Sequence, residues 1–561
     1  MSFSLLSVPL PEKFLTMIHT RLLTLTLVLT SIAITETWAG NADGIPGNAG
    51  DHCVFNENIR YSQLVINSRI NDFKANTKDA GFGRHDAQGN MTESPTGTYT
   101  TLDYVPGLVA KAILEAVDYY KDDTEVEVRP WFYTIAHFGN SCDISSSGKA
   151  GRSFDDLNAV KLYFLLSQLA AEKRFDDTPT YTGTASIATA RQRFSDSRKA
   201  FASSNSNYVI KESTLTEAAG GWWHKASYTD QMWCDGLYMG AALMAQLING
   251  DTDYSHITAD DWQLLTRQFT ISWKFLWDDD VRLLYHAFTA DPAGTAASQW
   301  AGISAQKGQE VYHSVEFWGR SVAWYFLALV DVLEQMQKAG LGNTERFTML
   351  STYLEQLAAG IAAKQDAESG CWYQLLNHDS TFIAASYNSS YRYTSSPVAN
   401  YLESSCTAIF TAAFLKGMRL GLIKTDYSEV ALKAYHGFIN HFMVADGNGG
   451  VHLVGCCKSA GLGGSNYRDG SAEYYLMGKD TKPTSTSGSD FYTEGKVLGG
   501  FIMAATEYER LMASTSVIMA NQCQPPHHTT HLWSLSGWRL SGKPLHQVYI
   551  KDKAKILSSP K

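Results

Sequence analysis

Apolar residues recur at three- and four-residue spacing along most of this chain, and Gly-, Asp-, Asn- and Ser-rich stretches separate the runs. This period gives each run one apolar face, which predicts an amphipathic α-helix. The expected helices cover residues 104–120, 155–173, 230–249, 259–277, 314–338, 344–364, 404–421, 427–443 and 495–514. They come in pairs with extended aromatic segments between the pairs, as at 371–376, which is typical of helical hairpins repeated along a chain.

Repeated helical hairpins can form an open solenoid or close into a ring. In this chain the residues with chemically active side chains fall in loops at the same ends of the predicted helices. A closed ring places such loops on one rim, around a central cleft, whereas a solenoid leaves their clustering unexplained. We therefore expect an all-α ring of about a dozen helices, with short β-like segments in the rim loops.

The N-terminal region has the pattern of a secretory signal. Arg21 precedes the apolar run 22–34, and Thr37-Trp-Ala39 follows it. The run is too short to span a bilayer, and no later segment reaches about 18 uninterrupted apolar residues. We expect residues 1–39 to be removed on export, with Met17 as an alternative start. The mature protein would then be periplasmic or secreted, without membrane insertion.

The rest of the chain divides into three parts. Residues 40–100 are rich in Gly, Asn and Asp and form an N-terminal extension, whereas 101–515 carry the helical pattern of the barrel. Residues 516–561 lose that pattern, and we expect them to form a flexible tail.

Charge and composition exclude some classes of function. The formal net charge is −10, from 46 Lys and Arg against 56 Asp and Glu, and there is no basic stripe, so nucleic acid is not an expected partner. Aromatic residues make up 12% of the chain, which suits a cleft where rings stack on sugars. The eight cysteines lack CxxC spacing, so we expect no zinc site, and their pairing stays open.

The densest group of candidate side chains lies around the segment Gln231-Met-Trp-Cys-Asp-Gly-Leu-Tyr-Met239, at the start of an apolar helix. Asp235 in this position needs a partner or a chemical role. Beside Trp233 and partly desolvated, its carboxyl would have a raised pKa, which is the property of a general acid near neutral pH. His224 is close enough in sequence to reach the same cleft. A hydrogen-bonded Asp of the core is the alternative.

Two further positions have a functional and a structural interpretation. Asp155 and Asp156 open a predicted helix, where carboxylates can simply cap the helix and offset its dipole. His286 is expected on a short extended segment after a helix, and a lone His is usually structural.

Arg320 lies between Trp318 and Trp324, near the start of a strongly apolar helix. An Arg in such surroundings needs an anionic partner. That partner is either a structural Asp or Glu, or the carboxylate of a substrate held by the planar guanidinium. The sequence does not choose between the two.

Together these segments resemble the unsaturated glucuronyl and rhamnogalacturonyl hydrolases of glycoside hydrolase family 105, which are related to family 88. The likeness covers roughly residues 100–513, and its most specific part runs from His224 to Met239. Further similar motifs are, in chain order, Tyr104-x-x-Gly107, Asp155-Asp-Leu-Asn158, Tyr285-His286, Trp318-x-Arg320 with Trp324, Leu402-Glu-Ser-Ser405, Tyr467-Arg-Asp-Gly-Ser471 and Gly500-Phe-Ile-Met-Ala-Ala-Thr-Glu507. Each motif is weak alone, but their order and spacing are specific.

The resemblance implies an (α/α)6 barrel and an unusual reaction. The substrate would be an oligosaccharide left by a lyase acting on ulvan or on pectin (rhamnogalacturonan), with a 4,5-unsaturated glucuronyl or galacturonyl residue at its non-reducing end. Hydration of the C4=C5 vinyl ether would release this sugar, since a carboxyl protonates C4, water adds at C5, and the hemiketal collapses. The resemblance implies no metal or other cofactor, and we expect a monomer or a weak dimer.

Carried over to this chain, the resemblance makes Asp235 the catalytic acid and base, and Asp155 a second catalytic carboxylate that positions the substrate or tunes Asp235. The residues expected to bind the substrate are Tyr104, His224, Trp233, Met239, His286, Trp318, Arg320 and Trp324. Between Trp318 and Trp324 the chain departs from the family's Trp-Ala-Arg-Gly-Asn-Gly-Trp, which leaves the identity of the sugar open.

Two other classes of protein remain as alternatives. An α/α-barrel polysaccharide lyase or epimerase would use a Tyr or His base and would create unsaturation instead of consuming it. A non-catalytic carbohydrate-binding barrel would not need an acid at position 235.

Overall fold

The computed structural model describes residues 44–75, 78–97, 103–142, 153–172, 175, 188–189, 191–197, 201, 208–250, 259–294, 297–301, 312–464 and 467–522, and short strands after them. Within these residues, six helical columns form a closed inner ring. In ring order the columns are α3 (Tyr104–Tyr120), α5 (Phe154–Asn158) leading through a 3-10 turn (Ala159–Lys161) into α6 (Leu162–Ala171), α8 (Cys234–Gly236) leading through a π-helical turn (Leu237–Ala241) into α9 (Ala242–Gly250), α12 (Gly319–Lys338), α14 (Ser404–Arg419) and α17 (Gly495–Gln522). Each column contacts the next, and α17 packs against α3 to close the ring.

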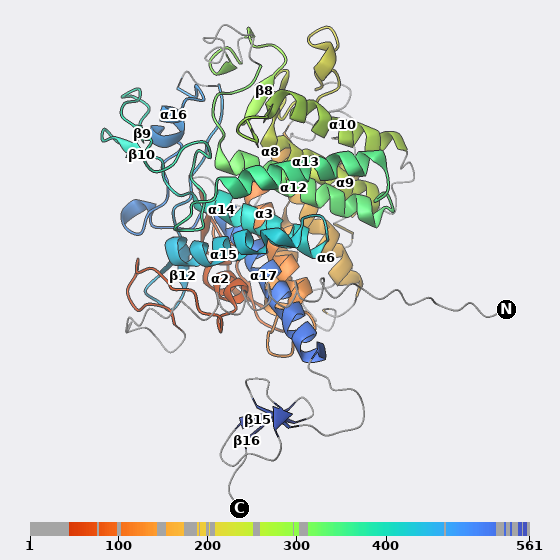
Figure 1. The fold of residues 1–561 in the computed structure, drawn as a ribbon, viewed down its shortest axis with the longest axis vertical. Helices are drawn as coiled ribbons and strands as arrows, with labels where there is room; N and C mark the ends of the chain where they lie inside the picture. Colours follow the sequence, from red (N-terminus) through yellow and green to blue (C-terminus); the bar gives the residue numbers. More distant parts are fainter. Residues whose placement is uncertain are drawn as a thin grey trace, which may run out of the picture.

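A second layer of helices packs on the outside of this ring. The outer helices are α2 (Tyr61–Arg69) on α17, α4 (Arg129–Ser141) on α3, α10 (Ala259–Leu276) on α9, α13 (Glu345–Ala363) on α12 and α15 (Ser428–Phe442) on α14. Figure 1 shows α13 lying along α12. An inner helix such as α12 is covered on all sides, so nearly all its residues are buried. The predicted (α/α)6 barrel is confirmed.

Short antiparallel strand pairs stand in the loops of the barrel, as expected from the sequence. The paired strands are β1 (Phe73–Ala75) with β2 (Lys78–Ala80), β3 (Arg84–His85) with β4 (Met91–Glu93), β5 (Gln231–Trp233) with β8 (Ala287–Thr289), β6 (Trp277–Asp278) with β7 (Leu283–Leu284), β9 (Ile383–Ala384) with β10 (Val398–Ala399), and β11 (Met443–Ala445) with β12 (Val451–Leu453). A short helix, α16 (Ala472–Met477), follows them.

The helix predicted at 230–249 begins later than the apolar pattern suggests. Its first residues form strand β5, and the helix starts at Cys234. The backbone at Asp230 has a φ of 55°, a left-handed conformation that is incompatible with a helix interior. Periodicity alone does not separate a short apolar strand from the first turn of a helix. The π-helical turn after Gly236 is a distortion that is frequent at functional sites.

The sequence pattern also misses helices α2 and α4. Helix α4 has Pro130 in its first turn, a start signal, but His137 and Gly139 interrupt its apolar run. Helix α2 lies in the expected N-terminal extension, where the backbone N–H and hydroxyl of Ser62 donate to Glu509 of α17 at 3.1 and 2.6 Å. This part of the extension is therefore packed onto the barrel.

Helix α17 continues to Gln522 and does not end at 514, because no proline occurs before Pro525. After it, strands β13 (Leu532–Ser534), β14 (Arg539–Leu540), β15 (Val548–Lys551) and β16 (Ala554–Leu557) pair in the order β14-β13-β15-β16. The flexible tail stays a prediction, and the predicted signal peptide at 1–39 lies outside the described residues.

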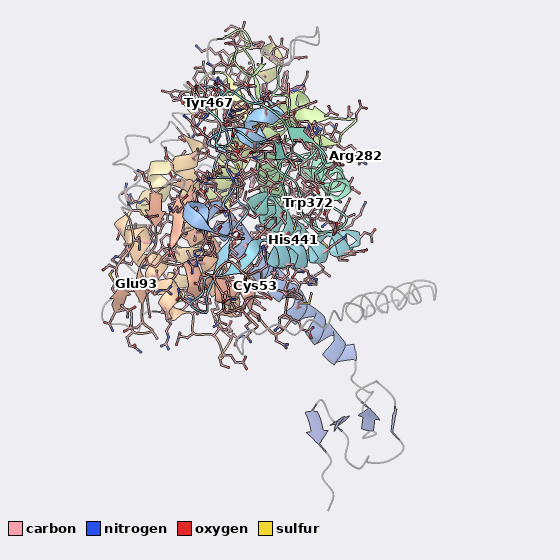
Figure 2. All side chains as sticks on the ribbon, turned by 90° about the vertical axis from the view of Figure 1, so that its left-hand side faces the viewer. Cys53, Glu93, Arg282, Trp372, His441 and Tyr467 are labelled. Carbon is pink, nitrogen blue, oxygen red and sulfur yellow. The ribbon has the colours of Figure 1, made fainter. Side chains whose placement is uncertain are left out.

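Large aromatic side chains fill the core. Trp300, Trp318, Trp324 and Trp372 are fully buried, and Figure 2 shows Trp372 within the body of the molecule and the exposed Glu93 at its edge. The seven cysteines in the described residues are buried free thiols. Within that same part of the chain, no helix combines the length and apolarity needed to cross a bilayer.

Gly107 offers a test of the inner-ring packing. A Cβ at this position of α3 would lie 2.4 Å from Cβ of Ala159 in the neighbouring column, so Gly107→Ala forces the two columns apart. We expect the free energy of unfolding to fall by about 1–3 kcal/mol in urea titrations. Gly342→Ala is the control, because nothing lies within 4 Å of its added Cβ. Equal stability of the two variants would contradict this packing.

Candidate active site

Four inner columns begin around one cavity of about 650 Å³. The first turns of α3, α5, α8 and α12 contribute Tyr104, Asp155, Asp235 and Arg320 to its wall. First-turn N–H groups have no acceptor within their own helix, so this rim carries the positive ends of the helix dipoles. Such a rim favours an anionic ligand.

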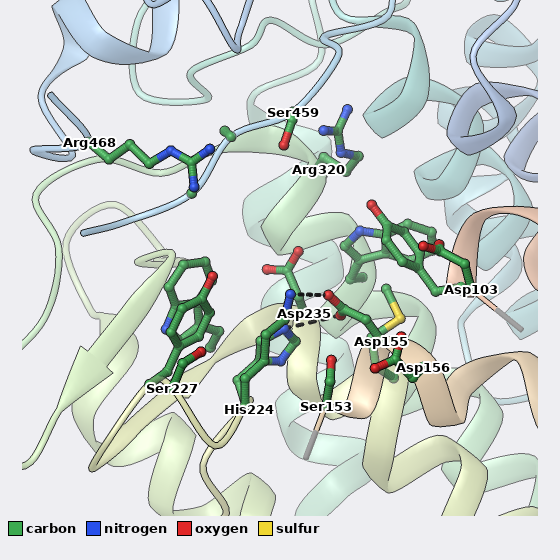
Figure 3. Close-up of a pocket in the computed structure, with 18 of the residues that line it drawn as sticks. Asp103, Ser153, Asp155, Asp156, His224, Ser227, Asp235, Arg320, Ser459 and Arg468 are labelled. Atoms are coloured by element: carbon green, nitrogen blue, oxygen red, sulfur yellow. Dashed lines mark ion pairs between the residues drawn. The ribbon is translucent and has the colours of Figure 1, made fainter. Parts of the chain in front are cut away.

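Nine of the ten residues predicted for the site meet in this cavity. They are Tyr104, Asp155, His224, Trp233, Asp235, Met239, Trp318, Arg320 and Trp324. The tenth, His286, is fully buried next to Asp235. In the view of Figure 3, Asp235 lies near the middle, with the guanidinium groups of Arg320 and Arg468 above it and Ser153 below.

Asp155 is the centre of an ion-pair cluster. Its Oδ1 lies 3.1 Å from Nε2 of His224, and its Oδ2 lies 2.5 Å from Nζ of Lys225 (Figure 3). Burial raises the pKa of this carboxyl, but Lys225 and His224 outweigh burial and hold its pKa well below the usual range. Asp155 is therefore ionised at neutral pH and is not a proton donor. Asp156 lines the cavity as well, so both acids face it.

Asp235 faces a different histidine. Its Oδ2 lies 3.4 Å from Nε2 of His286, and 16% of its side chain stays exposed. Burial raises the pKa of Asp235, as the sequence suggests, but His286 and His224 lower it by more, so that the net shift is downward. The raised pKa expected for Asp235 is wrong for this structure, because the sequence does not reveal that a histidine faces the carboxyl.

His286 is held from both sides. It precedes strand β8, on the short extended segment expected from the sequence, and its carbonyl accepts from the backbone N–H of Cys234 at 3.0 Å. Its Nδ1 lies 2.7 Å from the hydroxyl of Tyr475. Burial lowers the pKa of His286, so the ring is neutral near pH 7.

Aromatic rings line the cavity around these carboxylates. Trp233 stacks on Tyr228 with ring centroids 4.7 Å apart and planes 10° apart, and it stacks more loosely on His224 at 5.6 Å. Trp318 and Trp324 add two more indoles. Flat apolar walls of this kind match the faces of a sugar ring.

Arg320 has a structural partner. Its Nη1 lies 3.8 Å from Oε1 of the fully buried Glu403 and donates to the carbonyl oxygen of Cys457 at 2.6 Å. The structural carboxylate that the sequence left open is thus Glu403. The guanidinium also lies 4.6 Å from the ring of Trp318 and borders the cavity, where it can face an anion.

The π-helical turn after Asp235 rests on a buried lysine. Nζ of Lys161 donates to the carbonyl of Tyr238 at 2.5 Å and lies 3.4 Å from the centre of the Tyr238 ring. That ring stacks on Trp324 at 4.7 Å, and the next residue, Met239, lines the cavity. The distorted turn therefore carries one wall residue, Met239, and one residue that supports the wall residue Trp324.

Several residues in or next to the cavity are not predicted from the sequence. Lys225 and Tyr228 follow His224 in the same loop, and Arg468 belongs to the Tyr-Arg-Asp-Gly-Ser motif. The neighbouring motif residues could therefore have indicated that these three line the cavity. Asp103 caps α3, and burial raises its pKa. Tyr475 meets His286 across 189 positions, a contact without any local signal.

The described residues contain no group of three or more His, Cys, Asp or Glu side chains arranged to hold a metal ion.

The sequence profile of Glycosyl Hydrolase Family 88 matches residues 82–512. The chain belongs to this family. The resemblance drawn from the motifs is confirmed at this level, and the family 88 protein is a glycoside hydrolase. The match spans the whole inner ring from α3 to most of α17.

Relatives of this family 88 hydrolase include Protein Atu3128 of Agrobacterium fabrum, which is 29% identical over 235 residues, or 39% of this chain and 84% of that protein. A family 105 glycoside hydrolase of C. acetobutylicum superposes with a TM-score of 0.55 at 24% identity, covering 81% of this chain and 100% of that one. A possible family 105 member from Salmonella enterica gives 0.51 at 18% identity, over 82% and 96% of the two chains. Both structures share the fold.

Lys225→Met tests the ion-pair cluster. The variant leaves Asp155 with a single partner, and we expect the free energy of unfolding to fall by roughly 1–3 kcal/mol near neutral pH. Because the low pKa of Asp155 stabilises the fold only where this group is ionised in the unfolded chain, the loss should shrink below about pH 4. Urea titrations near pH 7 and near pH 3, where Asp155 of the unfolded chain is mostly protonated, measure the difference.

The matched control is Lys274→Met. Lys274 pairs with Glu217 at 2.7 Å, but both side chains are more than half exposed (51% and 60%), so the change should be at most about 1 kcal/mol. A Lys225→Met loss that is equally small, or that does not depend on pH, would contradict the pairing.

Proposed function

We propose that this hydrolase removes a 4,5-unsaturated uronic acid from the non-reducing end of oligosaccharides produced by a polysaccharide lyase. It does so by hydrating the C4=C5 vinyl ether. In this proposal Asp235 carries the proton chemistry and Asp155 positions the substrate.

The unequal state of the two carboxylates supports this reaction. Asp155, held by Lys225 and His224, is unsuited to donate a proton. Asp235 has no lysine or arginine within ion-pair distance among the described residues and lies 3.4 Å from the neutral ring of His286, so it can exchange one. Vinyl-ether hydration requires a single carboxyl that gives a proton and then takes one.

In the proposed steps Asp235 gives one proton and takes one back. Its carboxyl protonates C4, and the positive charge that develops on C5 and the ring oxygen is captured by water. The carboxylate accepts a proton from this water as the C5–O bond forms, so Asp235 ends the cycle protonated. The C5 hemiketal then opens, and the hemiacetal at C1 breaks to release the remaining oligosaccharide.

Binding of the substrate would raise the pKa of Asp235 and so favour its protonated, proton-donating form. A bound uronate adds a negative charge to the cavity and displaces water, and both changes raise the pKa of a neighbouring carboxyl. The helix N-termini and Arg320 would hold the uronate carboxylate, while the indoles of Trp233 and Trp318 pack on the sugar ring.

Ulvan and pectin (rhamnogalacturonan) are the proposed sources of the substrate, since lyases leave unsaturated uronyl ends on both. The apolar run at 22–34 supports export of the enzyme to the periplasm or the medium, where such polysaccharides are degraded.

Ultraviolet absorbance of the conjugated uronate tests the proposal directly. On lyase-treated oligosaccharides the enzyme should abolish this absorbance, and Asp235→Asn should slow the loss by about 10²–10⁴-fold because the proton donor is gone. Asp426→Asn is the control, since Asp426 is exposed between α14 and α15, at the other end of the barrel. A rise in absorbance on intact polysaccharide would identify a lyase and overturn the proposal.

The pH dependence tests the role of the substrate. The proton-donating form of Asp235 is lost as pH rises through its pKa, and that pKa is lowered in the protein alone. The descending limb of kcat, which reports the substrate complex, should therefore lie at higher pH than the limb of kcat/KM, which reports the free enzyme. Coincident limbs would show that the substrate does not raise this pKa.

A further inference from the structure

Tyr475 is a buried neighbour of the site that the proposed reaction does not use. Its hydroxyl lies 2.7 Å from Nδ1 of His286, whose Nε2 faces Oδ2 of Asp235 at 3.4 Å. Tyr475 and His286 are both completely buried. The three side chains form a line from the core to the cavity.

Several contacts fix the two rings of this line. The side-chain amide of Gln374 donates to the carbonyl of Tyr475 at 3.1 Å, and its oxygen accepts from Nε1 of Trp318 at 3.1 Å. The ring of Tyr475 also stacks on Trp318, with centroids 6.0 Å apart. The backbone N–H of Cys234 donates to the carbonyl of His286 from the other side. The hydrogen bonds to the two carbonyls hold the backbone of both residues, and the stacking on Trp318 packs the ring of Tyr475.

The number of protons along the line favours one arrangement. A neutral imidazole carries a single ring proton, and an ionised carboxylate only accepts hydrogen bonds. With Asp235 ionised, a proton on Nδ1 would leave the lone pair of Nε2 against the carboxylate, so the form with the proton on Nε2, facing Oδ2 at 3.4 Å, is favoured. Nδ1 is then an acceptor, and the hydroxyl of Tyr475 must donate to it. Burial raises the pKa of Tyr475 far above its usual value, so this hydroxyl keeps its proton.

We propose that Tyr475 is a positioning residue, whose hydroxyl holds His286 in the tautomer with the proton on Nε2 and so keeps a donor aimed at Asp235. This donor stabilises the carboxylate that forms as Asp235 gives its proton to the substrate. The stabilisation of Asp235 during the reaction rests on the proposed function. The tautomer of His286 does not, because it is a property of the protein without substrate.

Other charged groups act on the same line and stay unchanged when Tyr475 is replaced. Asp235 faces His286, His224 and Asp155. His286 faces Asp235, His224, Arg320 and Tyr475. A change seen on removal of the Tyr475 hydroxyl alone therefore reports the tautomer of His286.

Tyr475→Phe tests the catalytic part. The variant keeps the ring and loses the donor to Nδ1, so we expect kcat to fall by about 10–10²-fold with KM within about threefold. Because the carboxylate loses its donor, the pKa of Asp235 rises, and the descending limb of kcat/KM should move up by about one pH unit. Tyr163→Phe is the control, since the buried hydroxyl of Tyr163 donates to the carbonyl of Gly139, away from the cavity.

The tautomer itself can be measured without activity. In the ¹⁵N spectrum of the histidine-labelled wild-type protein, with His286 assigned by His286→Gln, Nε2 should carry the proton, and Tyr475→Phe should reduce this form. A wild-type signal with the proton on Nδ1 overturns the proposal, even if the Phe variant does not fold. The proposal is also overturned if Tyr475→Phe lowers kcat but leaves the descending limb of kcat/KM at the same pH, because that result indicates a purely structural role. A wild-type enzyme that leaves unsaturated uronyl oligosaccharides intact rejects the proposed function but not the tautomer.

Discussion

The packing of α17 on α3 closes the ring, and the positions of the site residues depend on it. Gly495 and Gly499 stand one turn apart on α17. A Cβ on them would lie 2.5 Å from Cγ1 of Val105 and 2.6 Å from Cγ of Leu108. Any larger side chain would push α17 off α3 at this seam. Since α3 starts at Tyr104, the same seam sets where Tyr104 stands in the cavity wall.

Closure also separates the charges of the barrel between its two ends. Inner helices begin at the cavity, where first-turn carboxylates such as Asp155 and Asp235 lie in the positive field of the helix dipoles. At the far end, Nζ of Lys416 lies 2.7 Å from both Asp331 and Glu334, which ties α14 to α12. The far end is thus fastened by an ion-pair cluster between two helices, while the near end, where Asp155 and Arg320 have ion pairs of their own, keeps room for a ligand.

Most inner helices and many site residues can be predicted from the sequence, because they depend on local patterns along the chain. The apolar period predicts most inner helices, and the run from His224 to Met239 brings its own site residues together within one loop and one helix start. What the sequence lacks is contact across long separations. The pairing of Asp235 with His286 depends on β5 meeting β8, and it reverses the pKa shift that burial of an isolated carboxyl would give.

The cations of the cavity already have partners, and this bears on how an anionic sugar would act there. Lys225 lies on Asp155, Arg320 near Glu403, and Arg468 2.8 Å from Asp480. A uronate entering the cavity would meet helix N-termini and partly neutralised guanidinium groups, so that much of its negative charge would remain uncompensated beside Asp235. A carboxyl that is ionised in the protein alone would then gain its proton where the vinyl ether is bound. Such an arrangement would tie proton donation to the presence of the uronate in the proposed single-carboxyl mechanism.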